Sequence, residues 1–246
     1  MAEKQDKDKL LWWEIPARGA VLVIMILFFI PDHWYRAAYH NTLGRFFRKT
    51  VETRMEKISP DVEKRISLKQ IPSKIWIIAL KQERRLEAWG EDASGKRTLI
   101  KSVPIIAASG KTGPKLREGD KQVPEGIYPV DFLNPNSLFY LSLRVGYPSE
   151  EDKRIAHKEG RDIATLGGDI MIHGSGPSAG CLSIANRSME EIFYLAAKSG
   201  IENTTVIIAP FDFREKPLPE NTEPEWLHSR YQDMEKVMKT MINLKR

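Results

Sequence analysis

The sequence has almost no cysteine, since among its 246 residues only Cys181 carries a thiol. A single cysteine excludes an intramolecular disulfide framework. Basic runs interleaved with aromatic side chains are also missing, which excludes the usual footprint of nucleic-acid binding. The net charge of +5 is mild and suits approach to an anionic surface, such as phospholipid or an acidic wall polymer. Histidine and acidic residues do not reach ligand spacing around a common turn, so no metal site is predicted.

A nucleotide-binding loop is missing as well. Residues 109–114, Ser-Gly-Lys-Thr-Gly-Pro, have the composition of a phosphate-binding loop but lack the G-x-x-x-x-G-K-[ST] order. We interpret this stretch as a turn, and the sequence predicts no cofactor.

Long hydrophobic runs are scarce. The apolar run 19–30 is shorter than the roughly twenty residues that a membrane-spanning helix needs. Apolar residues 10–13 and the aromatic pair Trp34 and Tyr35 extend it, and no A-x-A-like cleavage site follows. We therefore predict a cytoplasmic tail and an uncleaved membrane anchor over residues 1–35, with a cleavable signal peptide and a buried core helix as alternatives. Lysine and arginine lie on both sides of the run, so charge alone does not decide the orientation.

Residues 36–73 are polar and rich in charged side chains. Apolar residues recur there at helical spacing, namely Leu43, Phe46, Phe47 and Val51. This spacing predicts a helical linker, which either lies on the membrane surface or is solvated on all sides. Residues 71–73, Ile-Pro-Ser, mark the predicted boundary of the next domain.

From Lys74 onward the sequence is dominated by short β-rich runs. Turn signals separate these runs at intervals of about a dozen residues, a spacing that is typical of sandwich or barrel domains. We predict a mainly β fold, a β-sandwich or barrel-like domain with flanking helices, over residues 74–212. The runs that we assign to strands are 75–80, 86–89, 98–108, 124–133, 137–145 and 204–209.

Two helices are predicted in the last third of the chain. Ser188 and Glu191 have the spacing of a capping box and predict the start of one helix, which Gly200 ends. Apolar residues at helical spacing over 223–243 predict an amphipathic helix within the C-terminal segment 213–246, packed on the domain or on a partner.

The segment 146–168 is a long polar insertion. Its length and composition predict a loop that serves as a lid or as a wall of a substrate site. It contains His157, one of two histidines considered below as a catalytic base.

The stretch 170–186 carries the strongest functional signal. Two short apolar runs flank a turn rich in glycine, proline and serine, which is typical of two strands joined by a loop. His173 lies at the end of the first run and Cys181 at the start of the second. A cysteine attacks as a thiolate, and a neighbouring imidazole can take its proton.

The turn before the cysteine has a second possible role. Backbone N–H groups of Ala179, Gly180 and Cys181 are candidates for stabilising an oxyanion, because small residues leave them accessible. A structural explanation is equally available for each residue alone. A lone cysteine is commonly a small buried hydrophobe, and a lone histidine is commonly a polar group with satisfied hydrogen bonds.

The pattern H-G-x-x-x-S-x-G-C at residues 173–181 resembles the active-site signature of the L,D-transpeptidase catalytic domain, the YkuD-like family. The neighbouring segments I-M-I-H-G, S-A-G-C-L-S and M-E-E-I-F are most similar to its YafK-type branch. The resemblance extends more loosely from about Lys74 to Pro210.

The resemblance implies a role for each residue of the pattern. Cys181 would be the nucleophile, and His173 the base, since His173 and not His157 lies in the pattern. The backbone carbonyl of Gly174 would orient the imidazole, and the N–H groups of Gly180 and Cys181 would bind the oxyanion. Ser178 and Tyr147 are the substrate contacts implied.

The activity implied is acyl transfer on peptidoglycan stem peptides through a thioester, resolved by an amine in L,D-transpeptidation or by water in hydrolysis. Many family members have an arginine two residues after the cysteine, where this chain has Ser183. YafK-type members also lack it, and they include enzymes that hydrolyse the link between a lipoprotein and the wall.

The expected partners are stem peptides, wall-linked lipoprotein and the inner membrane, with the catalytic domain in the periplasm. The alternative is a catalytically silent, membrane-tethered module that binds peptidoglycan and carries Cys181 as an inert buried thiol.

Overall fold

The computed structural model describes residues 49–242 of the chain. The part that it describes belongs to one compact unit that begins at Lys49. The predicted membrane anchor, residues 1–35, lies outside the described residues. Within residues 49–242 no helix combines the length and the apolar character that a membrane crossing requires.

Two parallel strands, β1 (Lys74–Leu80) and β9 (Thr204–Ala209), form the centre of the domain. Side chains of a strand alternate between its two faces, and both faces of this pair are covered. Ile75 and Ile77 of β1 belong to one apolar cluster, whereas Ile78 and Leu80 belong to a second cluster on the opposite face. Burial on both faces explains why β1 and β9 read as continuous apolar runs and not as alternating ones.

Nine strands form a single curled sheet in the order β3-β2-β1-β9-β5-β6-β7-β8-β4. The prediction of a mainly β, barrel-like domain with flanking helices is therefore confirmed. The remaining strands are β2 (Arg85–Glu91), β3 (Arg97–Pro104), β4 (Ala107–Ala108), β5 (Gly126–Ser137), β6 (Tyr140–Val145), β7 (Met171–His173) and β8 (Leu182–Ser183).

The curl of the sheet follows from the segment 97–108, which was predicted as one strand. Its first part, β3, pairs with β2 at one end of the sheet, and its last part, β4, pairs with β8 at the other end. Ile105 and Ile106 lie between the two parts, and each forms a backbone hydrogen bond to a different end of the sheet. The N–H of Ile105 donates to the carbonyl of Arg84, and the N–H of Ile106 donates to the carbonyl of Ser183. The same segment thus holds both ends of the sheet close together.

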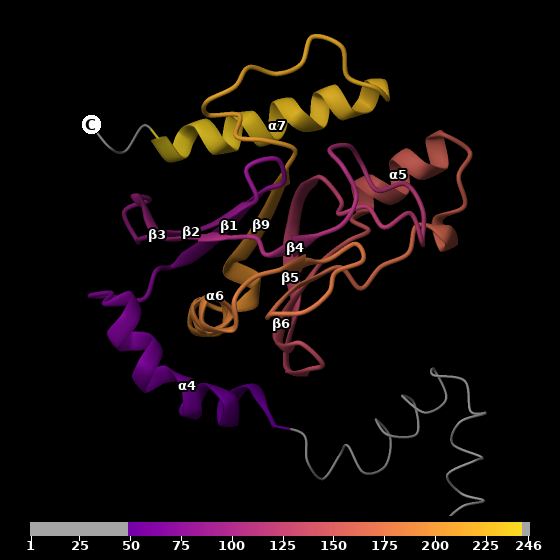
Figure 1. The fold of residues 1–246 in the computed structure, drawn as a ribbon. Helices are drawn as coiled ribbons and strands as arrows, with labels where there is room; N and C mark the ends of the chain where they lie inside the picture. Colours follow the sequence, from indigo (N-terminus) through magenta and orange to yellow (C-terminus); the bar gives the residue numbers. More distant parts are fainter. Residues whose placement is uncertain (1–48, 243–246) are drawn as a thin grey trace, which may run out of the picture. The chain divides into compact units, whose positions relative to one another are not determined.

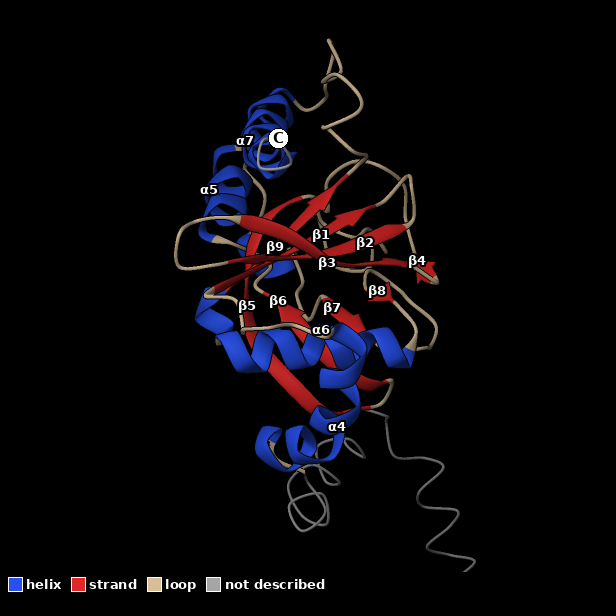
Figure 2. Cartoon of the chain, turned by 90° about the vertical axis from the view of Figure 1, so that its left-hand side faces the viewer, coloured by secondary structure: helices blue, strands red, loops and turns tan. Residues whose placement is uncertain are grey.

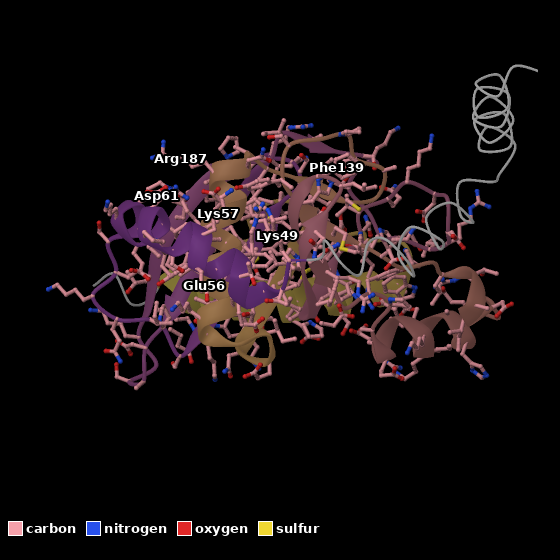
Figure 3. All side chains as sticks on the ribbon, turned by 90° about the horizontal axis from the view of Figure 1, so that it is seen from below. Lys49, Glu56, Lys57, Asp61, Phe139 and Arg187 are labelled. Atoms are coloured by element: carbon pink, nitrogen blue, oxygen red, sulfur yellow. The ribbon has the colours of Figure 1, made fainter. Side chains whose placement is uncertain are left out.

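Helices cover both faces of the sheet (Figure 1; Figure 2). On one face lie α4 (Val51–Ile66) and α6 (Asn186–Ser199), and across the other lies α7 (Glu225–Ile242). The larger apolar cluster fills the space between the sheet, α6 and α4, and Ile58 and Val62 of α4 are part of it. Exposed polar residues of α4 face away from this core, among them Glu56, Lys57 and Asp61 (Figure 3).

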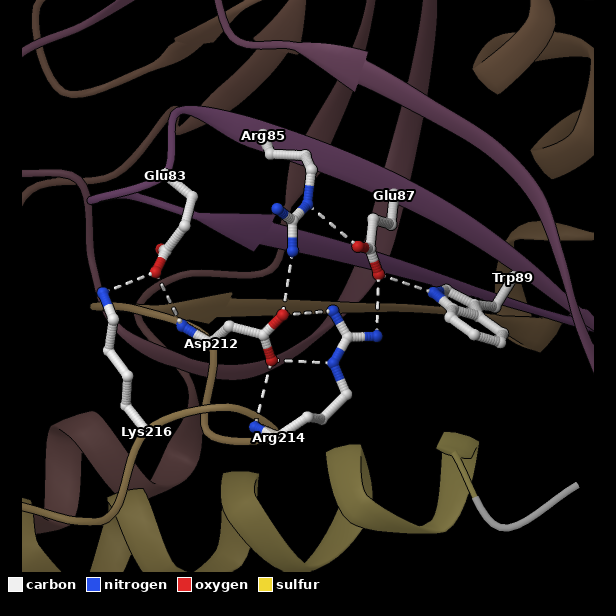
Figure 4. Close-up of polar contacts among 7 residues, drawn as sticks. All are labelled: Glu83, Arg85, Glu87, Trp89, Asp212, Arg214 and Lys216. Carbon is white, nitrogen blue, oxygen red and sulfur yellow. Dashed lines mark hydrogen bonds and ion pairs between the residues drawn. The ribbon is translucent and has the colours of Figure 1, made fainter. Parts of the chain in front are cut away.

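The second cluster lies under α7, as the amphipathic pattern predicted. Its apolar side chains on α7 are Leu227, Tyr231, Met234, Met238 and Met241. Next to this cluster the segment after β9 joins β2 through charged groups (Figure 4). Arg214 bonds Asp212 at 2.7 Å and Glu87 at 2.9 Å, and all three side chains are buried. Because each carboxylate has an arginine partner, these charges can lie in the interior.

Two local predictions are wrong. The segment 146–168 is not a loop throughout, because it contains α5 (Glu150–Lys158) and a short 3-10 turn, η1 (Ile163–Thr165). Ser149 and Asp152 form a capping box that starts α5, and Ile155 and Ala156 anchor it in the interior.

The second correction concerns the start of α6. The predicted capping box at Ser188 does not form, because the helix already begins at Asn186 with Ala185 as its N-cap and no side-chain cap. Glu191 is instead buried and paired with Arg65 and Lys101. The predicted end of this helix at Gly200 is confirmed.

Part of the predicted helical linker, residues 36–73, is described. Residues 36–48 lie outside the described residues, and α4 is a helix that packs against the core of the domain. Arg65 of α4 forms ion pairs with Glu190 and Glu191 of α6, at 2.7 and 2.9 Å. The packing of α4 on α6 thus places the start of the compact domain well before Lys74.

Candidate active site

Strands β7 and β8 bring the two predicted catalytic residues together. The strands are parallel, with Ile172 opposite Leu182 and His173 opposite Ser183. Ile172 and Leu182 point into the apolar core. His173 ends β7, and Cys181 comes directly before β8. Sγ of Cys181 lies 3.4 Å from the N–H of Met171, two residues before His173.

His173 is almost completely buried and fixed by its neighbours. Its Nδ1 lies 2.7 Å from the carbonyl oxygen of Gly174, which also accepts a hydrogen bond from the Ser183 hydroxyl at 3.2 Å. The ring of Phe139 packs on the imidazole with 4.8 Å between the ring centroids. Because a carbonyl oxygen can only accept, Nδ1 carries the hydrogen, and Nε2 of the neutral ring is free to take a proton.

The electrostatic environment keeps His173 neutral. Burial lowers the pKa of the imidazole below its ordinary value of 6.5, and the hydrogen bond to Gly174 offsets part of this effect. A neutral imidazole with an unprotonated Nε2 is the form that a general base requires.

Gly174 has no room for a side chain. A Cβ atom at this position would lie 2.4 Å from Oδ1 of Asn186 and 2.6 Å from the carbonyl oxygen of Phe139. Asn186 Oδ1 in turn accepts the N–H of Ser175 at 2.9 Å. The close approach of these groups fixes the carbonyl of Gly174, and through it the orientation of the imidazole.

Cys181 is partly exposed and protonated in this environment. Burial raises the pKa of its thiol above the ordinary value of 9.0, while the N–H of Met171, 3.4 Å from Sγ, lowers it by a smaller amount. The thiol lies 3.7 Å from the carbonyl oxygen of Asp169, to which it donates. Cysteine and histidine are thus both neutral at rest, which suits proton removal during attack and not a preformed ion pair.

Of the predicted oxyanion donors, the N–H of Gly180 is already occupied. It donates to the hydroxyl of Ser109 at 2.6 Å, and that hydroxyl donates to the carbonyl of Lys121 at 2.7 Å. Gly180 adopts a φ of 91°, a conformation that favours glycine. Among residues 49–242 no acceptor pairs with the N–H of Cys181, so this donor is available to a substrate carbonyl.

Sequence reasoning missed Ser109, because it was assigned only to a turn. Its proximity to Gly180 depends on the pairing of β4 with β8, which no local pattern reveals. Phe139 and Ser183 were missed for a similar reason. Their roles depend on contacts with His173 and Gly174 that only the folded sheet creates.

The two predicted substrate contacts lie in different surroundings. Ser178 is partly exposed, and its hydroxyl donates to the carbonyl of Cys181, so it shapes the catalytic turn. Tyr147 is buried, and its hydroxyl donates to the carbonyl of Lys115 at 3.2 Å. This placement does not support a direct substrate contact by Tyr147. His157 is exposed in the last turn of α5.

Strands β7 and β8 lie inside a recognised domain. The family model of the L,D-transpeptidase catalytic domain, YkuD, matches residues 74–208. The chain belongs to the YkuD family. This match confirms the resemblance read from residues 173–181.

Curated relatives of the chain include candidate L,D-transpeptidases named YafK from Escherichia coli. The chain is 31% identical over 155 residues to the protein of strain K12, a match that covers 61% of this chain and 59% of YafK. The protein of strain O157:H7 matches with the same figures. The chain therefore spans about three fifths of the relatives that it matches.

Solved structures with a similar fold include two bacterial proteins. One is the helical cell shape determining protein Pgp2 from Campylobacter jejuni, with 21% identity and a TM-score of 0.44, covering 61% of this chain and 54% of Pgp2. The other is Bd1075 from Bdellovibrio bacteriovorus, with 19% identity and a TM-score of 0.40, covering 68% and 56% of the two chains.

Proposed function

We propose that this protein is a cell-wall enzyme that uses Cys181 as the nucleophile for acyl transfer on peptidoglycan stem peptides. One observation carries the proposal. In a YkuD domain, His173 ends one of two neighbouring parallel strands and Cys181 directly precedes the other, and the Gly174 carbonyl accepts the Nδ1–H, which leaves Nε2 free to act as the base.

The proposed reaction has two halves. Sγ of Cys181 attacks the carbonyl carbon of a stem-peptide amide while Nε2 of His173 takes the thiol proton. The N–H of Cys181 stabilises the oxyanion, and the protonated imidazole gives its proton to the leaving amine as the C–N bond breaks. The resulting thioester is resolved by an amine or by water, with His173 again taking the proton of the attacking group and returning it to the thiol.

The acceptor that resolves the thioester determines which reaction the enzyme catalyses. An amine acceptor would give L,D-transpeptidation, and water would give hydrolysis of the same class of amide bond. Ser183, where many family members have arginine, is buried and donates to the carbonyl of Gly174. No cation at this position is therefore available to recognise an acceptor.

The proposed setting is the periplasmic face of the inner membrane. The apolar run at residues 19–30 would anchor the chain, and the catalytic domain would reach stem peptides and wall-linked lipoprotein. This setting rests on the sequence and on the substrate class proposed here.

Mass spectrometry of the full chain with tetrapeptide muropeptides and with lipoprotein-linked muropeptides tests the proposal, and Cys181→Ala is the control. Joined stems that require Cys181 would show an amine acceptor, and released lipoprotein peptides or trimmed stems would show water. The partly buried, protonated thiol favours one competitor, a silent wall-binding module. Absence of any Cys181-dependent product, together with retained binding to wall sacculi, would establish that module instead.

A further inference from the structure

A cavity of about 570 Å³ lies between the loop 114–122 and the segment 161–165. Arg117, Asp120, Gln122, Arg161 and Asp162 contribute its charged or amide side chains. Nothing in the proposed chemistry of His173 and Cys181 uses these side chains.

The walls of the cavity continue into the catalytic turn. A Cβ atom on Gly180 would lie 3.4 Å from the carbonyl oxygen of Gln122, so one wall borders the residue before Cys181. The segment that forms the other wall continues along the chain to Asp169, whose carbonyl oxygen accepts a hydrogen bond from the thiol of Cys181. The two walls are joined by the N–H of Glu118, which donates to the carbonyl of Thr165 at 2.7 Å. The segments that line this cavity therefore continue into residues that contact Gly180 and Cys181.

Most of the charge in the cavity lining is already neutralised. The carboxylate of Asp120 accepts four hydrogen bonds, from the ammonium of Lys115 and from the backbone N–H groups of Leu116, Arg117 and Gln122. Arg161 is paired with Glu159 and also donates to the carbonyl of Leu116 at 3.0 Å. Asp162 accepts the N–H of Ala164 and caps η1.

Two donors in the lining have no partner among residues 49–242. One is the guanidinium of Arg117, which takes part in no hydrogen bond or ion pair with the described residues. The other is the amide nitrogen of Gln122, whose Oε1 accepts the N–H of Lys111 at 2.8 Å and thereby fixes the orientation of the amide. A guanidinium and an amide N–H₂ group that line the same cavity, both without a partner among the described residues, form a donor set that suits a carboxylate.

We infer that this cavity binds the C-terminal carboxylate of the peptide substrate through Arg117 and Gln122. The inference rests on the proposed function and adds to it a specificity-determining site. A charge-assisted pair of this kind discriminates against a neutral amide by about tenfold or more.

The test compares a tetrapeptide stem with a free C-terminal carboxylate and the same peptide with a C-terminal amide. Wild-type full chain is expected to have a KM at least about tenfold lower for the carboxylate, with kcat changed less. Arg117→Gln should abolish this preference and leave the KM for the amide nearly unchanged. Arg154→Gln is the matched control, since Arg154 is exposed on α5 and does not line the cavity, and should retain the preference.

A wild-type enzyme without this preference, or an Arg117→Gln enzyme that keeps it, would overturn the inference. Binding of both peptides to full-length Cys181→Ala protein gives a second readout that does not require turnover. If no Cys181-dependent turnover occurs at all, the proposed function fails. In that case the inference is still decided by whether Arg117→Gln removes a carboxylate preference in binding.

Discussion

Substitution of Gly174 by alanine tests whether the catalytic turn depends on the absence of a side chain. The added Cβ atom would meet Asn186 Oδ1 at 2.4 Å and the carbonyl oxygen of Phe139 at 2.6 Å. Reaching ordinary contact with the Phe139 backbone requires a displacement of about 0.8 Å. Overpacking of this kind typically costs about 1–3 kcal/mol in the free energy of unfolding. For a domain of this size, the cost corresponds to a loss of roughly 2–12 °C in Tm.

The same displacement should impair catalysis. The carbonyl of Gly174 holds Nδ1 of His173 at 2.7 Å, so a shift of the turn moves the imidazole relative to Cys181. Misplacement by about 1 Å can cost on the order of a hundredfold in rate. We therefore expect Gly174→Ala to lower kcat/KM by about that factor, measured with the substrate found for the wild-type enzyme.

Gly168→Ala is the matched control. A Cβ atom at Gly168 would lie 3.7 Å from its nearest neighbour, the carbonyl oxygen of Tyr147, which is an ordinary contact. Its free energy of unfolding in urea should stay within about 0.5 kcal/mol of the wild type. Equal stability and equal kcat/KM for the two variants would refute the reasoning on Gly174.

Two further predictions concern charge. Burial lowers the pKa of His173 below 6.5 and raises the pKa of Cys181 above 9.0, so kcat/KM should be independent of pH between these values. At lower pH kcat/KM should fall because the base His173 is protonated. At higher pH it should fall because the proton for the leaving amine is lost. A steep acid limb centred well above pH 6.5 would contradict a neutral pair. Replacing Arg214 by alanine leaves the buried carboxylates of Asp212 and Glu87 without their main cation, and should cost about 3–5 kcal/mol in a urea unfolding experiment. A loss below 1 kcal/mol would show that these carboxylates find other partners.

Much of the fold could be predicted because its central strands carry strong local signals. The continuous apolar run 75–80 became β1, and 204–209 became β9. The number of layers could not be predicted, because a single curled sheet and a two-sheet sandwich have the same short strands and turns. What joins the two halves into one sheet is β5, which pairs with β9 through residues 126–129 and with β6 through residues 130–137. The pairing with β9 joins residues about eighty positions apart.

The two segments with capping-box spacing show that local spacing alone does not decide whether the box forms. Ser149 and Asp152 form one, at the start of a helix that the sequence analysis assigned to a loop. Ser188 and Glu191 have the same spacing, yet Glu191 is paired with Arg65 of a distant helix. A tertiary ion pair decided the outcome at the second position, and no pattern within a few residues contains that information.

His173 and Cys181 could be proposed as a catalytic pair because the pattern at residues 173–181 resembles the family signature. The protonation states of His173 and Cys181 could not be predicted from the sequence, because burial is the main cause of both pKa shifts. The hydrogen bond from the N–H of Gly180 to the hydroxyl of Ser109 could not be predicted from the sequence either. That contact joins two turns that are remote along the chain.

The parallel pairing of β1 with β9 has a consequence for how the chain acquires its structure. Residues 75–80 find their central partner only in residues 204–209, near the C-terminal end of the domain. In a growing chain β2 can pair with one edge of β1, but the edge that pairs with β9 stays exposed until nearly all of the domain is available. Long-range closure of this kind slows folding and prolongs the interval in which an unpaired strand can aggregate. Truncation before residue 204 should consequently yield insoluble protein and not a smaller folded domain, even though such a fragment retains both His173 and Cys181.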